Sequence, residues 1–323
     1  MVRTRASDPG RTIRRRRLVL GAVGLFVIVD VLLVAFAFAD SSYQSAARAP
    51  ASDLSAAPSP SLASATPEPS PTAEPVSAVP PTRILRSGSP SFAWRAETGP
   101  CPDVAASPEL TNDGGVTWKA TDASGPTGVR SLQSITIEGP RVASMIGQAS
   151  QGCAVTLIRT YVSGDNYGKY PADLPESWYV DPLNRSRVHS PEGDFAAPCT
   201  TVVALAQRER AAAAILCADR TVFLTLDSAA TWSAPIAAEG VVALATSGEG
   251  YVLAAVGAPD CAGVEIVSIT DPTVPTEMTG CLGTDAAPAS FAGTVAMSKS
   301  SGTLWIWAKD ILARSADGGA TWL

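Results

Sequence analysis

The sequence predicts an all-β fold, a β-propeller in which sheets of four antiparallel strands repeat around an axis. Three observations predict it: an eight-residue motif occurs three times, short β-rich runs separate its copies, and the spacing is that of whole sheets. Copies and weaker echoes start near residues 111, 163, 225, 268 and 315, at intervals of about 45 to 60 residues. Dividing the roughly 240 residues of the globular part by one blade length gives about five blades, with six or seven as alternatives.

The repeated motif places a hydroxyl residue first, Asp third, Thr seventh and Trp eighth, in residues 111–118, 225–232 and 315–322. An apolar run precedes the second and third copies. In a turn, Asp accepts hydrogen bonds from nearby backbone N–H groups and Gly adopts positive φ, whereas Thr and Trp suit a half-buried strand. The motif therefore predicts a tight turn between two strands, with the Trp opening the returning strand.

This spacing resembles the Asp-box, or BNR repeat, of sialidase-type and sortilin-type β-propellers and of a photosystem assembly factor family. The resemblance implies a structural role for the motif, because the boxes of those families lie in outer hairpins away from the functional face. A degenerate fourth box is expected with Ser163 as its hydroxyl residue, Asp165 as its acid and Tyr170 in place of the Trp. The expected structural residues of the three clear boxes are Thr111, Asp113, Gly115, Thr117, Trp118, Asp227, Thr231, Trp232, Ser315, Asp317, Gly319, Thr321 and Trp322.

Runs of four to eight β-rich residues lie between the boxes and predict antiparallel strands. They include residues 132–137, 142–146, 154–161, 200–205, 212–217, 222–226, 241–245, 251–256 and 264–269. The chain ends one residue after Trp322, before the last sheet has an outer strand. Because residues 92–96 resemble residues 116–120, we expect residues 92–96 to supply that strand and so to close the ring.

The N-terminal residues have the pattern of a membrane anchor. Residues 1–17 carry seven Arg and one Asp, and residues 18–39 form an apolar run interrupted only by Asp30. This run can cross a bilayer as a helix, and the preceding charges place the N-terminus in the cytoplasm. Asp30 is either a tolerated acid or a contact with a partner helix. A signal peptide cleaved after Ala39 is the alternative; under both interpretations the rest of the chain lies outside the cytoplasm.

Residues 40–82 are rich in Ala, Ser, Pro and Thr, which predicts a disordered, extended linker. Residues 83–323 then form the predicted propeller. Removal of the basic leader leaves a net charge of about −12 on residues 18–323, which argues against nucleic acid as a partner.

All six cysteines follow residue 100 and are therefore expected outside the cytoplasm, where disulfides form. Fifteen pairings are possible for six cysteines. The repeat favours Cys199 with Cys217 and Cys261 with Cys281, each within one blade, which leaves Cys101 with Cys153. The chain has no CxxC motif and one histidine, so we expect neither a metal nor a cofactor.

No catalytic residue is assigned. The sialidases that the motif resembles use an arginine triad, an Arg-Ile-Pro signature and a Tyr–Glu pair; Arg83-Ile84-Leu85 matches that signature only in part, and no triad is evident. The segment from residue 161 to 195 is instead rich in aromatic residues, which suit binding to proteins or sugars. The alternative is that these aromatics fill a blade edge or the central channel. The expected binding residues are Tyr161, Tyr167, Tyr170, Trp178, Tyr179 and His189.

The sequence thus predicts a single-pass protein of the cell membrane, anchored through residues 18–39, whose extracytoplasmic propeller binds or scaffolds an unidentified protein or glycan. A sialidase-like exo-acting glycoside hydrolase and an assembly factor for a membrane complex are the alternatives. A binding role is favoured over catalysis, because no pair of carboxylates stands out among many acids.

Overall fold

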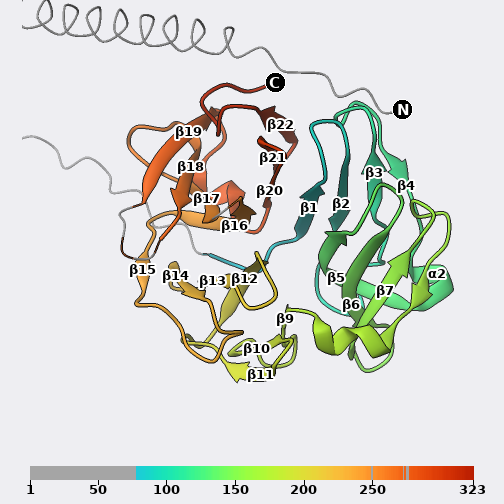
Figure 1. Ribbon diagram of the computed structural model, residues 1–323. Helices are drawn as coiled ribbons and strands as arrows, with labels where there is room; N and C mark the ends of the chain where they lie inside the picture. The colour runs from blue at the N-terminus through green and yellow to red at the C-terminus, as the bar shows by residue number, and fades with distance from the viewer. Residues whose placement is uncertain (1–77, 249, 272, 274–275) are drawn as a thin grey trace, which may run out of the picture. The chain divides into compact units, whose positions relative to one another are not determined.

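The computed structural model describes residues 78–323 except 249, 272 and 274–275. Their strands form six antiparallel sheets, which we number blades 1 to 6 in chain order (Figure 1). The basic leader, the predicted membrane span at residues 18–39 and most of the linker lie outside the described residues. Within the described part of the chain, no helix has the length and apolar character needed to span a bilayer.

The first three blades occupy the first half of the described chain. Blade 1 contains β1 (Arg83–Ser87), β2 (Ala93–Glu97), β3 (Glu109–Thr111) and β4 (Lys119–Ala120). After the short helix α2 (Ser124–Thr127), blade 2 contains β5 (Val129–Ile137), β6 (Ala143–Ala149), β7 (Val155–Thr160) and β8 (Gly168–Lys169). The 3-10 helix η2 (Pro171–Glu176) leads to blade 3, with β9 (Tyr179–Val180), β10 (Arg187–Ser190) and β11 (Gly193–Ala196).

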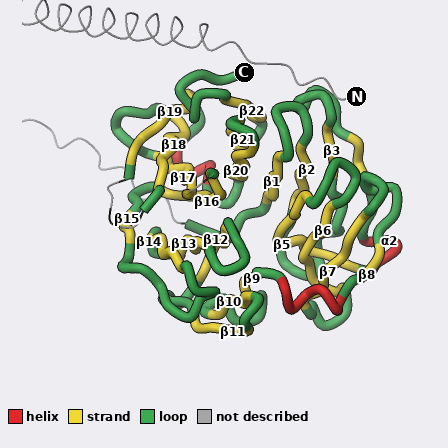
Figure 2. Tube along the Cα trace, in the orientation of Figure 1, coloured by secondary structure: helices red, strands yellow, loops and turns green. Residues whose placement is uncertain are grey.

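The last three blades follow the same order of strands. Blade 4 contains β12 (Val202–Gln207), β13 (Ala213–Cys217), β14 (Thr221–Thr225) and β15 (Ile236–Ala237). Blade 5 contains β16 (Val241–Ser247), β17 (Gly250–Val256), β18 (Gly263–Ile269) and β19 (Glu277–Gly283). The 3-10 helix η3 (Pro288–Phe291) precedes blade 6, with β20 (Val295–Ser300), β21 (Thr303–Ala308) and β22 (Ile311–Ser315). Figure 2 shows how few of the described residues are helical.

The first strands of the blades lie innermost and contact one another around the ring. β1 contacts β5 and β20, β16 contacts β12 and β20, and β12 contacts β9. Between blades 2 and 3 the contact runs instead through η2, which touches β7 and β10. The six sheets therefore close into a six-bladed β-propeller. The predicted fold is confirmed, and the number of blades is six, one of the two alternatives to the five that the sequence favoured.

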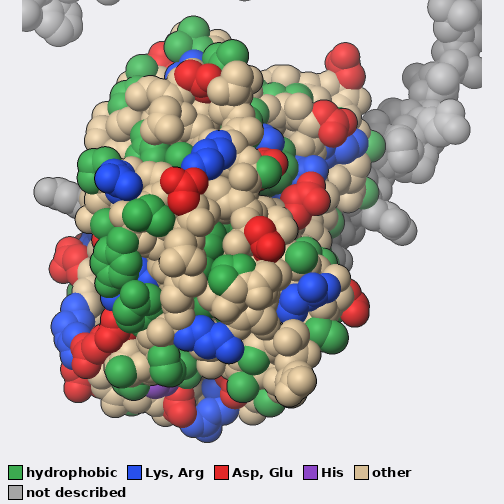
Figure 3. Space-filling model, turned by 90° about the vertical axis from the view of Figure 1, so that its right-hand side faces the viewer, with side chains coloured by type: hydrophobic (Ala, Val, Ile, Leu, Met, Phe, Trp, Pro, Cys, Tyr) green, Lys and Arg blue, Asp and Glu red, His purple; other side chains and the backbone are tan. Residues whose placement is uncertain are grey.

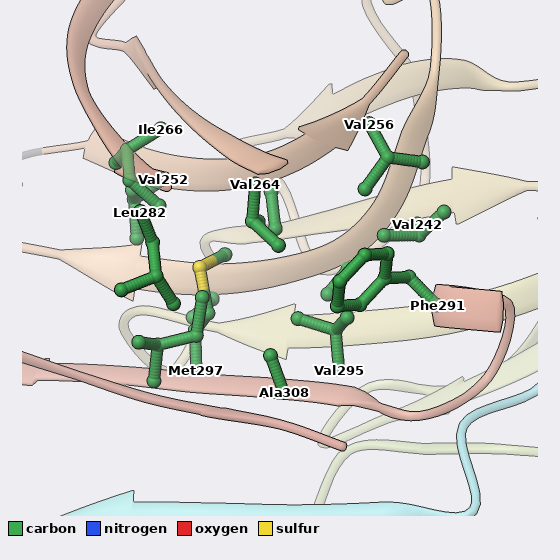
Figure 4. Packing of buried hydrophobic residues seen from close by; sticks show 14 of the residues in the cluster. Val242, Val252, Val256, Val264, Ile266, Leu282, Phe291, Val295, Met297 and Ala308 are labelled. Carbon is green, nitrogen blue, oxygen red and sulfur yellow. The ribbon is translucent and has the colours of Figure 1, made fainter. Parts of the chain in front are cut away.

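Buried apolar side chains fill the spaces between neighbouring blades. Alternate residues of a strand point to opposite faces of its sheet. In blade 6, Val295 and Met297 accordingly pack against blade 5, whereas Ala296 packs toward blade 1. Figure 4 shows Phe291 of η3 beside Val242 and Val295 in the cluster between blades 5 and 6. Burial of such surface stabilises the fold by roughly 25 cal/mol per Å².

Five of the six interfaces between blades have such an apolar cluster. The clusters join blades 1 and 2, 3 and 4, 4 and 5, 5 and 6, and 6 and 1. Among the described residues no buried apolar cluster joins blades 2 and 3. That interface is held by η2 instead, through the ion pair of Arg159 with Asp173 (2.7 Å) and a contact from His189 Nε2 to the Pro175 carbonyl (3.3 Å).

The predicted closing strand is wrong. Residues Ala93–Glu97 form β2, which pairs with β1 and β3 inside blade 1. The short hairpin after Ser87, in which Gly88 N–H donates to the Phe92 carbonyl (2.9 Å), keeps this segment beside β1. Blade 6 is extended by the end of the chain itself, because the N–H groups of Arg314 and Leu323 each donate to the other's carbonyl, at 3.1 and 2.8 Å.

Blades 6 and 1 close the ring through side chains. Ser87 donates from its backbone N–H and its Oγ to Ser298 Oγ, at 2.9 and 3.0 Å. The guanidinium of Arg95 lies between the rings of Trp118 and Trp307, 4.1 and 5.0 Å from their centroids. Cation–π contacts of this kind are worth about 0.5 to 2 kcal/mol.

The structure contains the two disulfides that the repeat favours and the third pair that they leave. Cys101 is bonded to Cys153, and the other two bonds lie within single blades, Cys199 to Cys217 and Cys261 to Cys281. The first bond connects the loop after β2 in blade 1 with the hairpin between β6 and β7 in blade 2. It therefore ties together two neighbouring blades.

Three turns after the third strands of blades 1, 4 and 6 have the same hydrogen bonds. In blade 1, Thr111 Oγ1 donates to Asp113 Oδ1 (2.7 Å) and accepts from Gly115 N–H (2.9 Å). Asp113 also accepts from the backbone N–H and Oγ1 of Thr117, at 2.9 and 2.6 Å. Equivalent bonds are made in blade 4 by Thr225, Asp227, Ala229 and Thr231, and in blade 6 by Ser315, Asp317, Gly319 and Thr321.

Each of these turns also contacts the preceding blade of the ring. In blade 6, the carbonyl oxygens of Gly318 and Gly319 accept from Thr279 Oγ1 (2.9 Å) and Cys281 N–H (3.1 Å) of blade 5. In blade 4, the Ser228 carbonyl accepts from Ser190 Oγ of blade 3 (2.8 Å). In blade 1, a Cβ on Gly115 would lie 2.6 Å from Leu312 of blade 6, so glycine permits the close approach.

The degenerate turn of blade 2 begins earlier than expected. Because β7 ends at Thr160, that residue supplies the first hydroxyl, and its Oγ1 accepts from Gly164 N–H (2.9 Å). Tyr167 then takes the Trp position, with its hydroxyl 2.7 Å from Thr121 Oγ1 of blade 1. Ser163 and Asp165 are therefore not the hydroxyl and the acid of this turn; Asp165 pairs with Lys119 (2.5 Å).

Ser228 occupies a left-handed position that the other turns fill with glycine. Its φ is 60°, against 77° and 78° at Gly114 and Gly318. A left-handed backbone conformation costs a residue other than glycine roughly 1 to 2 kcal/mol. Replacement by glycine removes this cost, but the greater conformational freedom of glycine in the unfolded chain offsets part of the stabilisation. We expect Ser228→Gly to raise the free energy of unfolding by about 0.5 to 1 kcal/mol in denaturant titrations. Gly318→Ser is the matched control and should lower it through the left-handed backbone alone, because a new Cβ would meet only Thr279 Cβ, at the ordinary contact distance of 3.9 Å. No change in either variant would contradict the strain.

The Asp carboxylates of the three turns should make the free energy of unfolding depend on pH in the acidic range. Hydrogen bonds from Thr117 and Thr111 lower the pKa of Asp113 to about 2, and equivalent bonds lower the pKa of Asp227 and Asp317. A lowered folded-state pKa stabilises the fold above the unfolded value of 3.8 and loses that effect as the pH falls through the folded value. We expect the melting temperature to fall between about pH 4 and 2. An Asn substitution at all three positions should flatten this slope; a slope as steep as in the parent protein would refute the assignment.

Candidate functional site

A cavity of about 1200 Å³ occupies the centre of the ring. The inner strands of all six blades line it, from β1 round to β20. It also reaches between blades 2 and 3, where its lining includes Gln148 and Leu157 on one side and Tyr179 and Leu183 on the other. Leu183 is 80% exposed, so the cavity is continuous with solvent at this side. The interface without an apolar core is thus also part of the cavity.

The carboxylates that line the cavity are all engaged by arginine. Arg159 pairs with Glu138 (3.2 Å) and with Asp173 (2.7 Å), and Arg210 pairs with Glu176. General acid–base chemistry on a glycoside needs two carboxylates at a set separation on either side of the bond. The described lining offers no two carboxylates outside these ion pairs.

Three lining arginines have neutral partners. Arg83 donates from Nη1 to the carbonyls of Lys309 and Thr294, and Arg185 donates to the carbonyls of Val202 (2.7 Å) and Val203 (3.1 Å). Arg86 donates from Nη1 to Thr246 Oγ1 (3.4 Å). Burial lowers the pKa of both Arg86 and Arg185. The lining therefore carries more positive than negative charge, although the chain as a whole is acidic.

The outer surface differs from the cavity. On the side of the molecule shown in Figure 3, basic and acidic side chains are interspersed, and neither sign forms a continuous patch. This side therefore lacks the basic face that a nucleic acid requires. The described residues also contain no group of three or more His, Cys, Asp or Glu side chains that could hold a metal ion.

The structure separates the six aromatic and histidine residues singled out from the sequence. Tyr167 and Trp178 are 4% and 3% exposed and belong to the apolar clusters of blades 1–2 and 3–4. Trp178 Nε1 also donates to the Arg210 carbonyl (2.9 Å). For these two residues the alternative that aromatics fill the blades is the one that the structure matches.

The other four residues lie at or near the surface on either side of η2. Tyr161, 51% exposed, packs edge-on against Tyr170 at 5.9 Å, and the Arg159 guanidinium lies 5.2 Å from the Tyr170 ring. Tyr179 lines the cavity and is stacked on His189 at 4.6 Å; His189 Nδ1 lies 2.7 Å from Asp194 Oδ1. The segment thus supplies two separate aromatic pairs and no single platform.

The sequence analysis did not find the arginines of the cavity. Arg83 and Arg86 lie in a run that otherwise reads as a buried strand, and this interruption of an apolar strand was the available signal. Arg185 lies in the polar loop between β9 and β10 of blade 3, so nothing in its local sequence distinguishes it. Only the closed ring brings these three positions to one cavity.

The fold and the cavity define a six-bladed β-propeller with a central cavity whose lining carries more positive than negative charge. No protein-family model and no curated protein matches the chain. Two structures of YCF48 are similar: one bound to a D1 peptide (14% identity, TM-score 0.30, 77% of this chain and 84% of that one) and one from Cyanidioschyzon merolae (13%, 0.39, 78% and 86%).

A third similar structure is PorZ, a surface component of the type-IX secretion system of Porphyromonas gingivalis (13% identity, TM-score 0.37, 77% of this chain and 38% of that one). At these identities and TM-scores the similarities carry no statement about a ligand or an activity of this chain.

Proposed function

We propose that this chain is a membrane-tethered, extracytoplasmic β-propeller that acts as a binding or scaffolding module for a protein or glycan, with the ligand seated in the central cavity. The observation that carries the proposal is the cavity itself: about 1200 Å³, continuous with solvent and lined by guanidinium groups that have only neutral partners. Sites for ligands are typically concave, with a few polar groups that fix orientation.

The ion pairs of the cavity carboxylates favour binding over hydrolysis. The cavity acids Glu138, Asp173 and Glu176 are each held in an ion pair, so none is poised as a general acid or nucleophile. The shared hydrogen bonds of the turns at Asp113, Asp227 and Asp317 support placing the chain among the Asp-box propellers, in the structural role that those boxes have. The hydrolase remains the second candidate on the strength of that resemblance alone.

The proposed tether is residues 18–39, followed by the linker. The three disulfides support an oxidising compartment for the propeller, because such bonds persist outside the cytoplasm. The described fold begins at Ala78, which packs in the cluster between blades 4 and 5, and Thr82 donates to the Gly293 carbonyl (2.7 Å). A soluble head for binding studies should therefore keep residues 78–82.

Filling the cavity should abolish capture of the ligand. Thr136 is an exposed residue on β5 that lines the cavity, so Thr136→Trp occupies it without replacing a buried side chain. In cross-linking of the full-length protein in native membranes, we expect this variant to lose at least 90% of its specific adducts (about tenfold). Ala120→Trp, on the exposed outer strand β4, should keep them. Equal yields from the two variants would remove the cavity from the proposal.

The tether predicts a definite topology. Protease added to intact cells should cleave the linker and release the propeller, whereas an epitope placed before residue 18 should resist until the membrane is broken. Release of the propeller by washing, with no protease, would instead indicate cleavage after Ala39. Protection of the propeller in intact cells would contradict the extracytoplasmic location.

A further inference from the structure

The contact between blades 2 and 3 depends on polar groups around η2. Among the described residues no buried apolar cluster joins these two blades. On the side of blade 2, Asp173 of η2 is paired with Arg159 of β7 at 2.7 Å. On the side of blade 3, η2 touches β10, where His189 Nε2 lies 3.3 Å from the carbonyl oxygen of Pro175. The contact of η2 with blade 3 therefore includes an ionisable side chain.

Both ring nitrogens of His189 face oxygen atoms. Nδ1 lies 2.7 Å from Asp194 Oδ1, and Nε2 lies 3.3 Å from the Pro175 carbonyl oxygen. A backbone carbonyl and an ionised carboxylate only accept hydrogen bonds. A neutral imidazole has one N–H group, whereas an imidazolium has two. Both contacts are therefore hydrogen bonds only when the ring carries two protons.

The sheet of blade 3 orients this ring. His189 pairs with Tyr179 of β9 on one side and with Asp194 of β11 on the other. Its ring is stacked on Tyr179, with the centroids 4.6 Å apart and the planes 14° from parallel, and its side chain is 14% exposed. A neutral ring in this orientation would set a nitrogen lone pair against one of the two oxygens.

His189 is the group in this region that changes charge near neutral pH. Histidine does so between about pH 5 and 8, where ordinary carboxylates, tyrosines and arginines keep one charge state. The chain has no other histidine. Burial raises the pKa of Tyr179, and Asp194 and Asp181 add to the effect, so its hydroxyl stays neutral. The further charged groups on the surrounding elements are Asp173 and Glu176 of η2, their partners Arg159 and Arg210, Arg187 of β10, and Glu192 in the turn before β11.

We propose that His189 is a pH-sensitive latch that holds η2 against blade 3. In the imidazolium form the ring donates to both Asp194 and Pro175. When one proton leaves, the remaining one stays on Nδ1 beside the charged carboxylate, which is the stronger acceptor, and the bond to η2 is lost. Because Asp173 and Glu176 of η2 line the central cavity, the latch acts on one wall of its side opening. This device requires no ligand and so stands apart from the proposed binding function.

Hydrogen exchange of the full-length protein in detergent tests the latch. The amides of Asp173 and Ser177 donate to the Tyr170 and Leu174 carbonyls, so their protection reports the order of η2. The latched state binds one more proton than the released state, so it is favoured at low pH and lost as the pH rises. After correction for intrinsic exchange rates, we expect protection of residues 171–177 to fall about threefold or more between about pH 5.5 and 8.

Two variants distinguish a latch from an ordinary ion pair. In Asp194→Asn the new amide can donate to Nδ1 of a neutral ring, which leaves Nε2–H free to bond to Pro175 at either pH. We therefore expect high protection of η2 at both pH values, although the ion pair is gone. His189→Gln should give low protection at both. Arg187→Gln changes a charge on the same strand without touching the latch and should keep the pH dependence of the parent protein.

Three outcomes would overturn the proposal. They are equal protection of η2 at both pH values in the parent protein, a pH dependence that persists in His189→Gln, and low protection at both pH values in Asp194→Asn. The amides of the buried strand β17 serve as the reference for folding, because their protection should match that of the parent protein in every variant.

Discussion

The hydroxyl–carboxylate bond that closes the turn after a third strand is the interaction on which the ring depends. In blades 1, 4 and 6 the Asp holds the far end of the turn by two hydrogen bonds, and the leading Thr or Ser holds the near end. In blades 4 and 6, carbonyl groups of the fixed turn accept hydrogen bonds from the preceding blade, and in blade 1 Gly115 of the turn lies close to Leu312 of blade 6. A local contact within eight residues thereby holds the turn against the neighbouring blade at three of the ring's interfaces, where apolar faces also pack.

The sequence predicted the features that depend on local pattern. Recurrent turns, short strands and cysteine spacing gave the propeller, the three clear turns and the disulfide pairs, because each is decided within one blade or by the repeat. The fourth turn was misplaced by three residues because Thr160 was read as part of the strand, and Ser163-Gly164-Asp165 imitates the start of a box. The closing strand was misassigned because residues 92–96 resemble residues 116–120. In the structure they pair instead with the neighbouring strand β1, because the short hairpin between the two strands has a small entropic cost of loop closure.

The cavity could not be predicted in the same way. Its wall combines side chains from six inner strands, the first and last of which lie more than two hundred residues apart, from Arg83 to Met297, and no local pattern marks Gln133 or Arg185. The sequence also could not show which aromatic residues of the segment from 161 to 195 are buried. Trp178 and Tyr167 pack inside the blades, whereas Tyr161 is exposed. The proposed binding site thus lies where the inner strands converge, whereas the residues that stabilise the fold lie in the turns and in the spaces between sheets.

The absence of an apolar cluster between blades 2 and 3, within the described part of the chain, has a mechanical consequence. The two blades are consecutive in sequence and are connected by η2, which contacts both of them. Separation of their faces would therefore break little apolar contact and would leave the two blades covalently connected. The short connection keeps the faces at high effective concentration and favours rapid reclosure. Separation of blades 2 and 3 would therefore disrupt less apolar packing than separation at any of the other five interfaces of the described ring, which each contain an apolar cluster.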